Sequence, residues 1–250
     1  MTLPILNTPT YSLVIPSTGK SIKFRPFLVK EEKLILIAAQ DADGKNASQY
    51  MTNAIKQVII NCTFGQVNPD LLTSYDVEYI FLQLKKRSSG SKEPLVITCN
   101  QLVTKPGSDV KVPCKTTYEV DFSLDDVKLD IPTNRERKVM LTDTVGMILR
   151  DPSFYQLEQL QFSDALDEVE IMYELVLTSI DTIFDGETIC TCDTKEELVA
   201  FVDSIPTEQF KKIKEYMDSI PKLKADIPVK CKSCGHEEVI TMEGLQSFLA

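Results

Sequence analysis

The sequence predicts an α+β protein in which helices pack with short antiparallel β-hairpins, including a zinc-ribbon-like hairpin pair. Three observations support this fold class. Apolar residues recur at helical spacing in several segments, and in other segments they alternate with polar residues as they do in strands. Turn-forming Pro, Gly and Asp residues separate these segments at short intervals. The chain of 250 residues is long enough to bury a substantial hydrophobic core.

Residues 1–93 are predicted to form a β-hairpin followed by helices. Within residues 10–27, apolar and polar residues alternate on both sides of a Pro-Ser-Thr-Gly turn, which indicates two strands. Residues 28–39 are rich in helix formers, and residues 48–62 carry apolar side chains at helical spacing. Residues 73–87 begin with a Thr-Ser cap and end with Lys-Lys-Arg, which suits the two ends of a third helix.

Residues 94–142 are predicted to be rich in strands. Apolar and β-branched runs in this part of the chain are separated by Pro-Gly and Pro-Cys turns. The expected strands cover residues 95–99, 110–112, 116–122 and 138–141.

Residues 143–250 are predicted to form an acidic helical region that ends in a Cys-x-x-Cys hairpin. After residue 164, apolar residues at helical spacing lie opposite acidic ones, and a Thr-Lys-Glu-Glu capping box begins at residue 194. The expected helices cover residues 143–149, 164–180, 194–204, 206–219 and 244–249, with a strand or loop at 187–192 and a hairpin formed by 227–230 and 238–242.

The composition argues against most classes of enzyme. The chain has one histidine, His236, no tryptophan and only 9 glycines. A single histidine leaves one position for Ser-His or Cys-His catalysis. The glycines form neither G-x-G-x-x-G nor G-x-x-x-x-G-K-[ST], so no nucleotide-binding loop is visible. We therefore predict a protein that is not an enzyme and has no catalytic residues.

The negative charge is concentrated in one part of the chain. The net charge is −10, and residues 151–250 alone carry 8 basic and 21 acidic side chains, a net of −13. One interpretation is a solvated helical face that keeps the protein soluble, and the other is a docking surface for a basic partner. Nucleic acid is not expected as a partner, because phosphate repels an acidic surface. No run reaches the roughly 18–20 apolar residues of a membrane span, so no membrane partner is expected either.

The seven cysteines indicate metal binding rather than disulfides. The N-terminal residues have no basic and apolar signal-peptide pattern, so a reducing compartment is expected. Cys231-Lys-Ser-Cys234-Gly-His236 is typical of a zinc knuckle, because a tight turn can direct two thiolates and backbone N–H groups toward one ion. One such knuckle supplies two ligands, so a second pair is needed.

Two other cysteine pairs can complete the site. Cys99 and Cys114 bracket a loop between two predicted strands, and the two segments share a strand-Cys-turn-Cys-strand order with the C-terminal hairpin. Cys190 and Cys192 lie two residues apart and form the alternative pair, and His236 can replace any one thiolate. The expected cofactor is one structural zinc ion, with unmetallated core or turn cysteines as the competing interpretation.

Three segments resemble signatures of the T4-type bacteriophage baseplate protein family. The first is Tyr-Ser-Leu-Val-Ile-Pro-Ser-Thr-Gly-Lys from residue 11 with Phe-Arg-Pro-Phe-Leu-Val-Lys-Glu-Glu-Lys from residue 24. The second is Asp-Val-Glu-Tyr-Ile-Phe-Leu-Gln-Leu-Lys-Lys-Arg from residue 76, and the third lies within residues 217–248. The family contains baseplate hub assembly proteins.

The resemblance implies a chaperone-like role in assembling the contractile-tail baseplate at its hub, in the cytoplasm of the infected host. The implied partners are other phage baseplate hub proteins. A permanent structural subunit of the hub, retained in the virion baseplate, is the alternative. The resemblance implies no catalytic residues.

Several charged and aromatic residues are candidates for partner binding. Arg25 and Phe27 either contact a partner or anchor the hairpin to the following helix. The basic run of residues 85–87 either docks on an acidic patch or completes a helix C-terminus. The candidates are Arg25, Phe27, Lys85, Lys86, Arg87, Glu168 and Glu170.

A carboxylate-dependent cell-wall hydrolase is a remote alternative. Asp164, Asp167, Glu168 and Glu170 lie close enough in sequence to suggest a pair of catalytic carboxylates. On a helix with an apolar stripe they are more simply its solvated face, and the absence of tryptophan leaves few aromatic platforms for a sugar.

Overall fold

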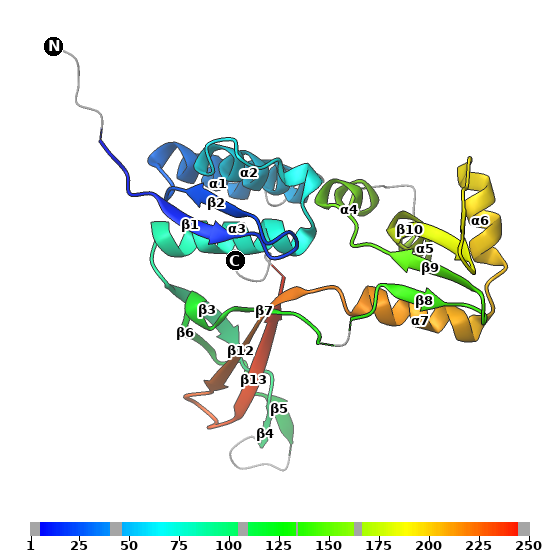
Figure 1. Cartoon of the computed structure of the whole chain (residues 1–250). Helices are drawn as coiled ribbons and strands as arrows, with labels where there is room; N and C mark the ends of the chain where they lie inside the picture. The colour runs from blue at the N-terminus through cyan, green and yellow to red at the C-terminus, as the bar shows by residue number, and fades with distance from the viewer. Residues whose placement is uncertain (1–5, 41–46, 105–109, 134, 163–166, 245–250) are drawn as a thin grey trace.

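The computed structural model describes residues 6–40, 47–104, 110–133, 135–162 and 167–244. Helices and short antiparallel sheets alternate along the chain, which confirms the predicted α+β class. Buried apolar side chains of the described residues form three clusters, and Figure 1 shows the helices and strands gathered into three groups around them. None of the described helices combines the length and the apolar character that a membrane crossing requires.

The first cluster lies between the N-terminal hairpin and three helices. Ile22 of the hairpin, Val58 and Phe81 are fully buried in it. The elements are β1 (Tyr11–Val14), β2 (Ser21–Phe24), α1 (Val29–Gln40), α2 (Ala47–Cys62), the short 3-10 helix η1 (Pro69–Leu71) and α3 (Ser74–Ser88).

The buried carboxylate of Asp76 fixes the start of α3. Thr73 is the N-cap of this helix and forms a capping box with Asp76, which satisfies backbone donors that the helix itself leaves unpaired. Asp76 also accepts hydrogen bonds from the backbone N–H and the hydroxyl of Ser17. The turn of the N-terminal hairpin is therefore attached to the beginning of α3.

The second cluster joins the middle of the chain to its C-terminal hairpin. β12 lies between β13 and β7, and all three strands are antiparallel. Figure 1 shows β12 and β13 beside β3 and β6. The elements are β3 (Lys92–Thr98), β4 (Leu102–Thr104), β5 (Lys111–Pro113), β6 (Thr117–Ser123), η2 (Leu124–Asp126), β7 (Lys128–Asp130), β12 (Lys222–Lys230) and β13 (Glu237–Glu243).

The third cluster lies between a four-stranded sheet and the acidic helices. The strand order is β11-β10-β9-β8. The elements are β8 (Lys138–Met140), β9 (Val145–Leu149), α5 (Glu168–Ser179), β10 (Ile180–Asp185), β11 (Thr188–Cys190), α6 (Lys195–Asp203) and α7 (Thr207–Asp218), and α4 (Phe154–Gln161) connects this group to the first. We call β8–β11 with α5–α7 the acidic unit.

The predicted helix at residues 143–149 is wrong, because this segment forms β9. β9 is an interior strand, paired with β8 on one side and β10 on the other, and its Met147 and Leu149 are fully buried. Gly146 fits because a Cβ atom there would lie 2.5 Å from the ring of Phe184. A short apolar run of this kind cannot be assigned to helix or strand from periodicity alone.

Other boundaries differ from the prediction for similar reasons. The helix expected to reach residue 180 ends one residue earlier, because Ile180 begins β10. Val169, expected on the buried stripe of that helix, is 77% exposed. α4, β4, β7 and β10 were not predicted, and most of the helical turn expected at 244–249 lies outside the described residues.

The division into residues 1–93, 94–142 and 143–250 stays a prediction. The C-terminal hairpin follows the acidic helices in sequence, but its Ile227 and Met242 are buried together with Phe122 in the second cluster.

One buried carboxylate connects the first and third groups. Asp151 forms a bidentate ion pair with Arg135 and accepts hydrogen bonds from the hydroxyls of Tyr75 and Tyr216, both at 3.0 Å. Tyr75 belongs to α3 and Tyr216 to α7. The Arg135 guanidinium also lies over the Tyr216 ring, 4.3 Å from its centroid. Both oxygens of the carboxylate therefore accept hydrogen bonds, and the donors come from three separate segments.

Replacing Asp151 by Asn should lower the free energy of unfolding by about 3 kcal/mol, because Arg135 would keep a mostly buried charge without its partner. Urea unfolding at neutral pH measures this change. Asp125→Asn is the control, because the Asp125 side chain is 68% exposed and its replacement should change stability by less than about 0.5 kcal/mol.

The pH dependence tests the same ion pair. Burial raises the pKa of Asp151, but the hydrogen bonds and charge of Arg135 outweigh it and hold this pKa below its ordinary value. The unfolded chain therefore takes up the proton first, and the stabilisation is lost as the pH falls below about 3.9. Wild type should lose more stability than Asp151→Asn on acidification, and parallel losses in the two proteins would contradict this assignment.

Candidate metal centre

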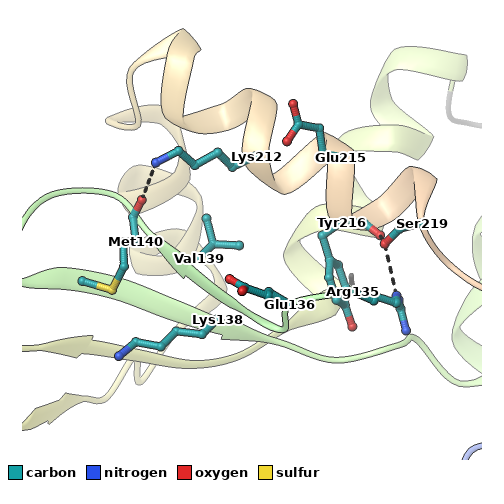
Figure 2. Close-up of a pocket in the computed structure, with 9 residues that line it drawn as sticks. All are labelled: Arg135, Glu136, Lys138, Val139, Met140, Lys212, Glu215, Tyr216 and Ser219. Carbon is teal, nitrogen blue, oxygen red and sulfur yellow. Dashed lines mark hydrogen bonds between the residues drawn. The ribbon is translucent and has the colours of Figure 1, made fainter. Parts of the chain in front are cut away.

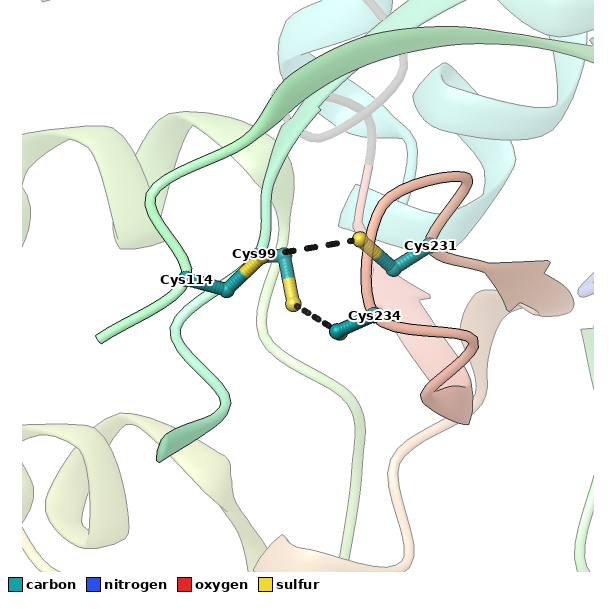
Figure 3. A group of neighbouring side chains, drawn as sticks. All are labelled: Cys99, Cys114, Cys231 and Cys234. Atoms are coloured by element: carbon teal, nitrogen blue, oxygen red, sulfur yellow. Dashed lines mark hydrogen bonds between the residues drawn. The ribbon is translucent and has the colours of Figure 1, made fainter. Parts of the chain in front are cut away.

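Four thiols converge where the middle strands meet the C-terminal hairpin. Cys99 follows β3, Cys114 follows β5, and Cys231 and Cys234 lie in the turn between β12 and β13. Figure 3 shows their side chains directed toward one another from the two segments. The four sulfurs all lie within 4.8 Å of one another. We call Cys99, Cys114, Cys231 and Cys234 the four-thiol cluster.

The spacing of the sulfurs suits one tetrahedral ion. The Sγ atoms of Cys99 and Cys234 are 3.7 Å apart, and those of Cys114 and Cys231 are 3.9 Å apart. A tetrahedron with metal–sulfur bonds of about 2.3 Å has edges of about 3.8 Å. All four cysteines are free thiols, and these separations are far longer than the roughly 2.05 Å of a disulfide bond.

The two halves of the cluster have the same backbone hydrogen bonds. In the C-terminal half, Cys231 N–H donates to the His236 carbonyl at 2.8 Å, and Gly235 N–H donates to the Cys231 carbonyl at 2.9 Å. In the other half, Cys99 N–H donates to the Thr116 carbonyl at 2.9 Å and Lys115 N–H donates to the Cys99 carbonyl at 2.8 Å. The half that contains Cys99 and Cys114 is thus a knuckle of the same geometry, and the β4–β5 hairpin is inserted between its two cysteines.

The residue after the second cysteine is left-handed in both halves. Gly235 has φ of +73° and Lys115 has φ of +53°. Glycine adopts this conformation without strain, whereas a residue with a Cβ atom does so at a cost of roughly 1–2 kcal/mol. The half that contains Cys99 and Cys114 therefore has a lysine at the position where the C-terminal half has glycine, the residue that this conformation favours.

Backbone amides direct partial positive charge at every sulfur of the cluster. Each Sγ accepts a hydrogen bond from the backbone N–H two residues later in the chain, which favours the thiolate that a metal binds. These donors are Gln101 for Cys99, Thr116 for Cys114, Ser233 for Cys231 and His236 for Cys234, and Cys231 also accepts from the N–H of Cys234, which lowers its pKa most.

The four thiols do not ionise alike. The side-chain hydrogen bond with Thr116 lowers the pKa of Cys114 to about 6. The Gln101 N–H lowers the pKa of Cys99, but burial and the neighbouring thiols outweigh it and raise this pKa to about 12. Backbone N–H groups lower the pKa of Cys231. Four negative charges in so small a space require a cation, so binding a divalent ion would displace the remaining protons.

The sequence alternatives to these ligands lie elsewhere. Cys190 ends β11 and Cys192 follows it, and both are exposed. Among the described residues, the metal-sized cluster contains neither of them and does not contain His236. The His236 Nε2 atom instead lies 4.0 Å from a carboxylate oxygen of Glu238. The pair bracketing the loop is therefore the one that the fold brings to the C-terminal knuckle.

The guanidinium of Arg25 makes its contacts within the chain. Arg25 is 8% exposed and forms a bidentate ion pair with the fully buried Glu31 of α1. This ion pair ties the hairpin to α1, and a partner contact through Arg25 stays a prediction. Phe27 packs on the ring of Phe81, with centroids 5.6 Å apart, so it contacts α3, and a partner contact through Phe27 stays a prediction.

The basic run at the end of α3 makes contacts within the chain. Lys85 pairs with Glu93 at 3.3 Å and Lys86 with Asp125 at 3.5 Å. The exposed Arg87 lies over the Tyr11 ring, 4.7 Å from its centroid. A partner contact through these residues stays a prediction.

The carboxylates at the start of α5 include its cap. Asp167 is the N-cap residue, and Glu170 closes a capping box by accepting from the Asp167 N–H at 2.9 Å. Asp164, the first residue of the suggested catalytic set, lies outside the described residues. A role of Glu168 and Glu170 in partner binding stays a prediction.

Several structurally decisive residues have no sequence signal of their own. Asp151 and Glu31 read as ordinary surface acids, and their partners are identified only by the fold. Lys115 conceals the first knuckle, because a Gly after Cys114 would have marked it in the way that Gly235 marks the second.

One family model matches the chain over residues 8–250, and its description is "T4 bacteriophage base plate protein". The match covers nearly the whole chain, including the four-thiol cluster. No curated protein and no solved structure matches the chain.

Replacing the two left-handed residues of the cluster should have opposite effects. Gly235→Ala should destabilise the protein by about 1 kcal/mol, because alanine is strained at this φ. Lys115→Gly should stabilise it by up to about 1 kcal/mol for the same reason. Urea unfolding measures both, with Lys232→Ala in the same turn as the control. Effects of the same sign would show that the two halves are not equivalent.

Proposed function

Because the chain belongs to the T4 bacteriophage base plate protein family, we propose that it is a baseplate hub assembly factor, a chaperone-like protein that holds hub proteins while the contractile tail is built. A role in the phage baseplate follows from the family itself. The observation that carries the proposal is the match to this family over residues 8–250, joined to the resemblance of three sequence segments to the signatures of a family that contains hub assembly proteins. Its place of action is the host cytoplasm during phage assembly.

The acidic unit supports a role in binding other proteins. Its exposed carboxylates are spread over α5, α6 and the β10–β11 hairpin, and its Lys195 is paired with Glu174 at 2.7 Å. A surface of one charge attracts a basic partner and repels further copies of itself. The exposed acids in and beside α5, α6 and the β10–β11 hairpin are Asp167, Glu170, Asp181, Asp185, Glu187, Asp193, Glu196, Glu197 and Asp203.

The proposed mechanism is masking of a basic surface on a hub protein. The acidic unit covers this surface until the correct neighbour joins the assembly. Such contacts are strong at low ionic strength and are screened when the Debye length shortens, so they can be exchanged for permanent ones. A permanent subunit, in contrast, remains in the virion baseplate at fixed stoichiometry, and mass spectrometry of isolated baseplates beside infected-cell lysate distinguishes the two roles.

Pull-down of the tagged protein from infected cells should recover baseplate proteins at low salt and progressively less as salt rises. The variant Asp181→Asn/Glu187→Gln/Glu196→Gln should recover less at every salt concentration. A matched control, Glu119→Gln/Asp121→Asn/Asp126→Asn, removes the same charge from exposed acids outside the acidic unit and should bind as wild type does. Binding that does not respond to moderate salt or to the first variant would contradict electrostatic docking.

The metal proposed for the four-thiol cluster is a structural Zn²⁺ ion. Four thiolates at tetrahedral spacing suit zinc and leave no open position for a catalytic water. In a reducing cytoplasm the thiols stay available as ligands. The ion would fasten the middle strands to the C-terminal hairpin, because each of these two segments contributes two of the sulfurs.

Purified protein should contain one zinc ion per chain by elemental analysis. Removing the ion with a chelator should lower the melting temperature by about 5–10 °C, because a ligand at 100 times its Kd contributes about 2.7 kcal/mol to a protein of this size. Cys231→Ser should lose the ion, whereas Cys190→Ser is the control and should keep it. An unchanged melting temperature in chelator would contradict a structural metal.

A further inference from the structure

We propose that β11 is a docking edge, at which an extended lysine- and arginine-rich segment of a partner protein adds as a further strand to the four-stranded sheet. This inference rests on the proposed function and names the contact through which the acidic unit would bind. A strand added at a sheet edge gains affinity from backbone hydrogen bonds and specificity from neighbouring side chains.

The two edge strands of this sheet, β8 and β11, differ in what lies beside them. At the β8 edge, α7 lies alongside the strand, and Figure 2 shows Lys212 of α7 reaching the Met140 carbonyl of β8. The Nζ of Lys212 donates to this carbonyl at 3.2 Å. Covering a sheet edge with a helix is a common protection against pairing with another chain. The β8 edge is therefore guarded.

The backbone direction in β11 follows from pairing on the far side of the sheet. The Val145 carbonyl accepts from Leu141 N–H at 2.9 Å, so the backbone groups of Val145 point toward β8. The backbone N–H and carbonyl groups of successive residues point to opposite sides of a strand. Those of Gly146 therefore point toward β10.

The same alternation carries across to the outer strand. Gly146 pairs with Phe184 of β10, so the backbone groups of Phe184 point back toward β9. Those of the adjacent Ile183 then point toward β11, where this residue pairs with Cys190. The N–H and carbonyl of Ile189, which pairs with Phe184, therefore point away from the sheet.

The β11 edge is exposed and apolar at its centre. Ile189 is 68% exposed, and every residue from 185 to 197 is exposed. No lysine or arginine guards this edge, because residues 185–194 contain none and Lys195 is occupied by Glu174. An unpaired edge with an exposed isoleucine is a surface that pairing would bury.

The negative charges around the β11 edge favour a basic segment as its occupant. Asp185 and Glu187 flank the start of β11, and Asp193 follows its end. A second copy of this acidic strand would be repelled, as would an acidic or phosphorylated segment. Lysine or arginine side chains on an added strand would lie beside these carboxylates, and its backbone would satisfy the Ile189 groups.

The native cysteines provide the probe for this contact. Cys190 and Cys192 are exposed thiols on and beside the edge. Cys62 is buried, and burial raises the pKa of its thiol to about 11, while the four-thiol cluster is engaged with itself. Both edge cysteines are therefore open to maleimide, and mass-spectrometric peptide mapping reads their modification separately from that of the low-pKa Cys114.

The test uses the full chain with a synthetic peptide of alternating Lys and Val residues, and with an alternating Glu-Val peptide as its charge control. The Lys-Val peptide should bind by fluorescence anisotropy and slow maleimide modification of Cys190 and Cys192, and the Glu-Val peptide should do neither. Ile189→Pro removes the outward N–H and should weaken binding about fivefold, the equivalent of one backbone hydrogen bond. Ile189→Val keeps this N–H and should bind as wild type does.

Each other outcome overturns the inference. Binding without protection of the two cysteines and without an effect of Ile189→Pro would mean docking by surface charge alone. Absence of peptide binding would exclude the edge as a site for such a strand. The footprint on wild-type protein does not depend on the variant's folding, which its melting temperature checks. If Ile189→Pro still recovers baseplate proteins from infected cells as wild type does, the edge inference fails while the proposed function stands. If wild type recovers none, the proposed function fails.

Discussion

The carboxylate of Asp151 is the interaction on which the arrangement of the helices depends. It lies between α3 and α7 and accepts hydrogen bonds from Tyr75 and Tyr216, which these two helices contribute. Arg135 completes the arrangement as a bidentate partner. A buried charge is stable only when its partners satisfy it, so the position of each helix is tied to the others through this one group. The acidic unit is consequently held on α3 by a polar contact.

The four-thiol cluster has the corresponding role in the second group of the fold. It joins two segments that are 117 and 135 residues apart at its sulfur pairs. The strands that carry these sulfurs are short, and short strands and hairpins have little stability alone. The equivalence of the two halves, down to the same backbone hydrogen bonds, places four N–H groups around one point. Among the described residues, the third group of the fold has no metal-sized cluster of this kind. Its four-stranded sheet is packed against helices instead.

Most of the outer surface of the acidic unit takes no part in the Asp151 ion pair or in the four-thiol cluster. Its inner face is occupied by the third apolar cluster, and one sheet edge is closed by α7. The remaining edge and the exposed carboxylates of α5, α6 and β11 face the surroundings. The charge concentrated beyond residue 150 thus belongs to a defined surface with an open strand edge, and a family role in the baseplate gives such a surface a class of partner.

Elements with local signals could be predicted from the sequence. The Thr73 cap of α3, the alternation in β1 and β2, and the Cys-x-x-Cys-Gly turn were all predicted, because caps, periodicity and turn residues act within a few positions. The sequence also contains the family signatures. Three other features are known only from the fold: residues 145–149 are an interior strand, Cys99 and Cys114 rather than Cys190 and Cys192 join the C-terminal knuckle, and Arg25 is buried against Glu31. Each of these depends on which distant segments come together, and the free energy of such contacts arises from burial and pairing that no local pattern records.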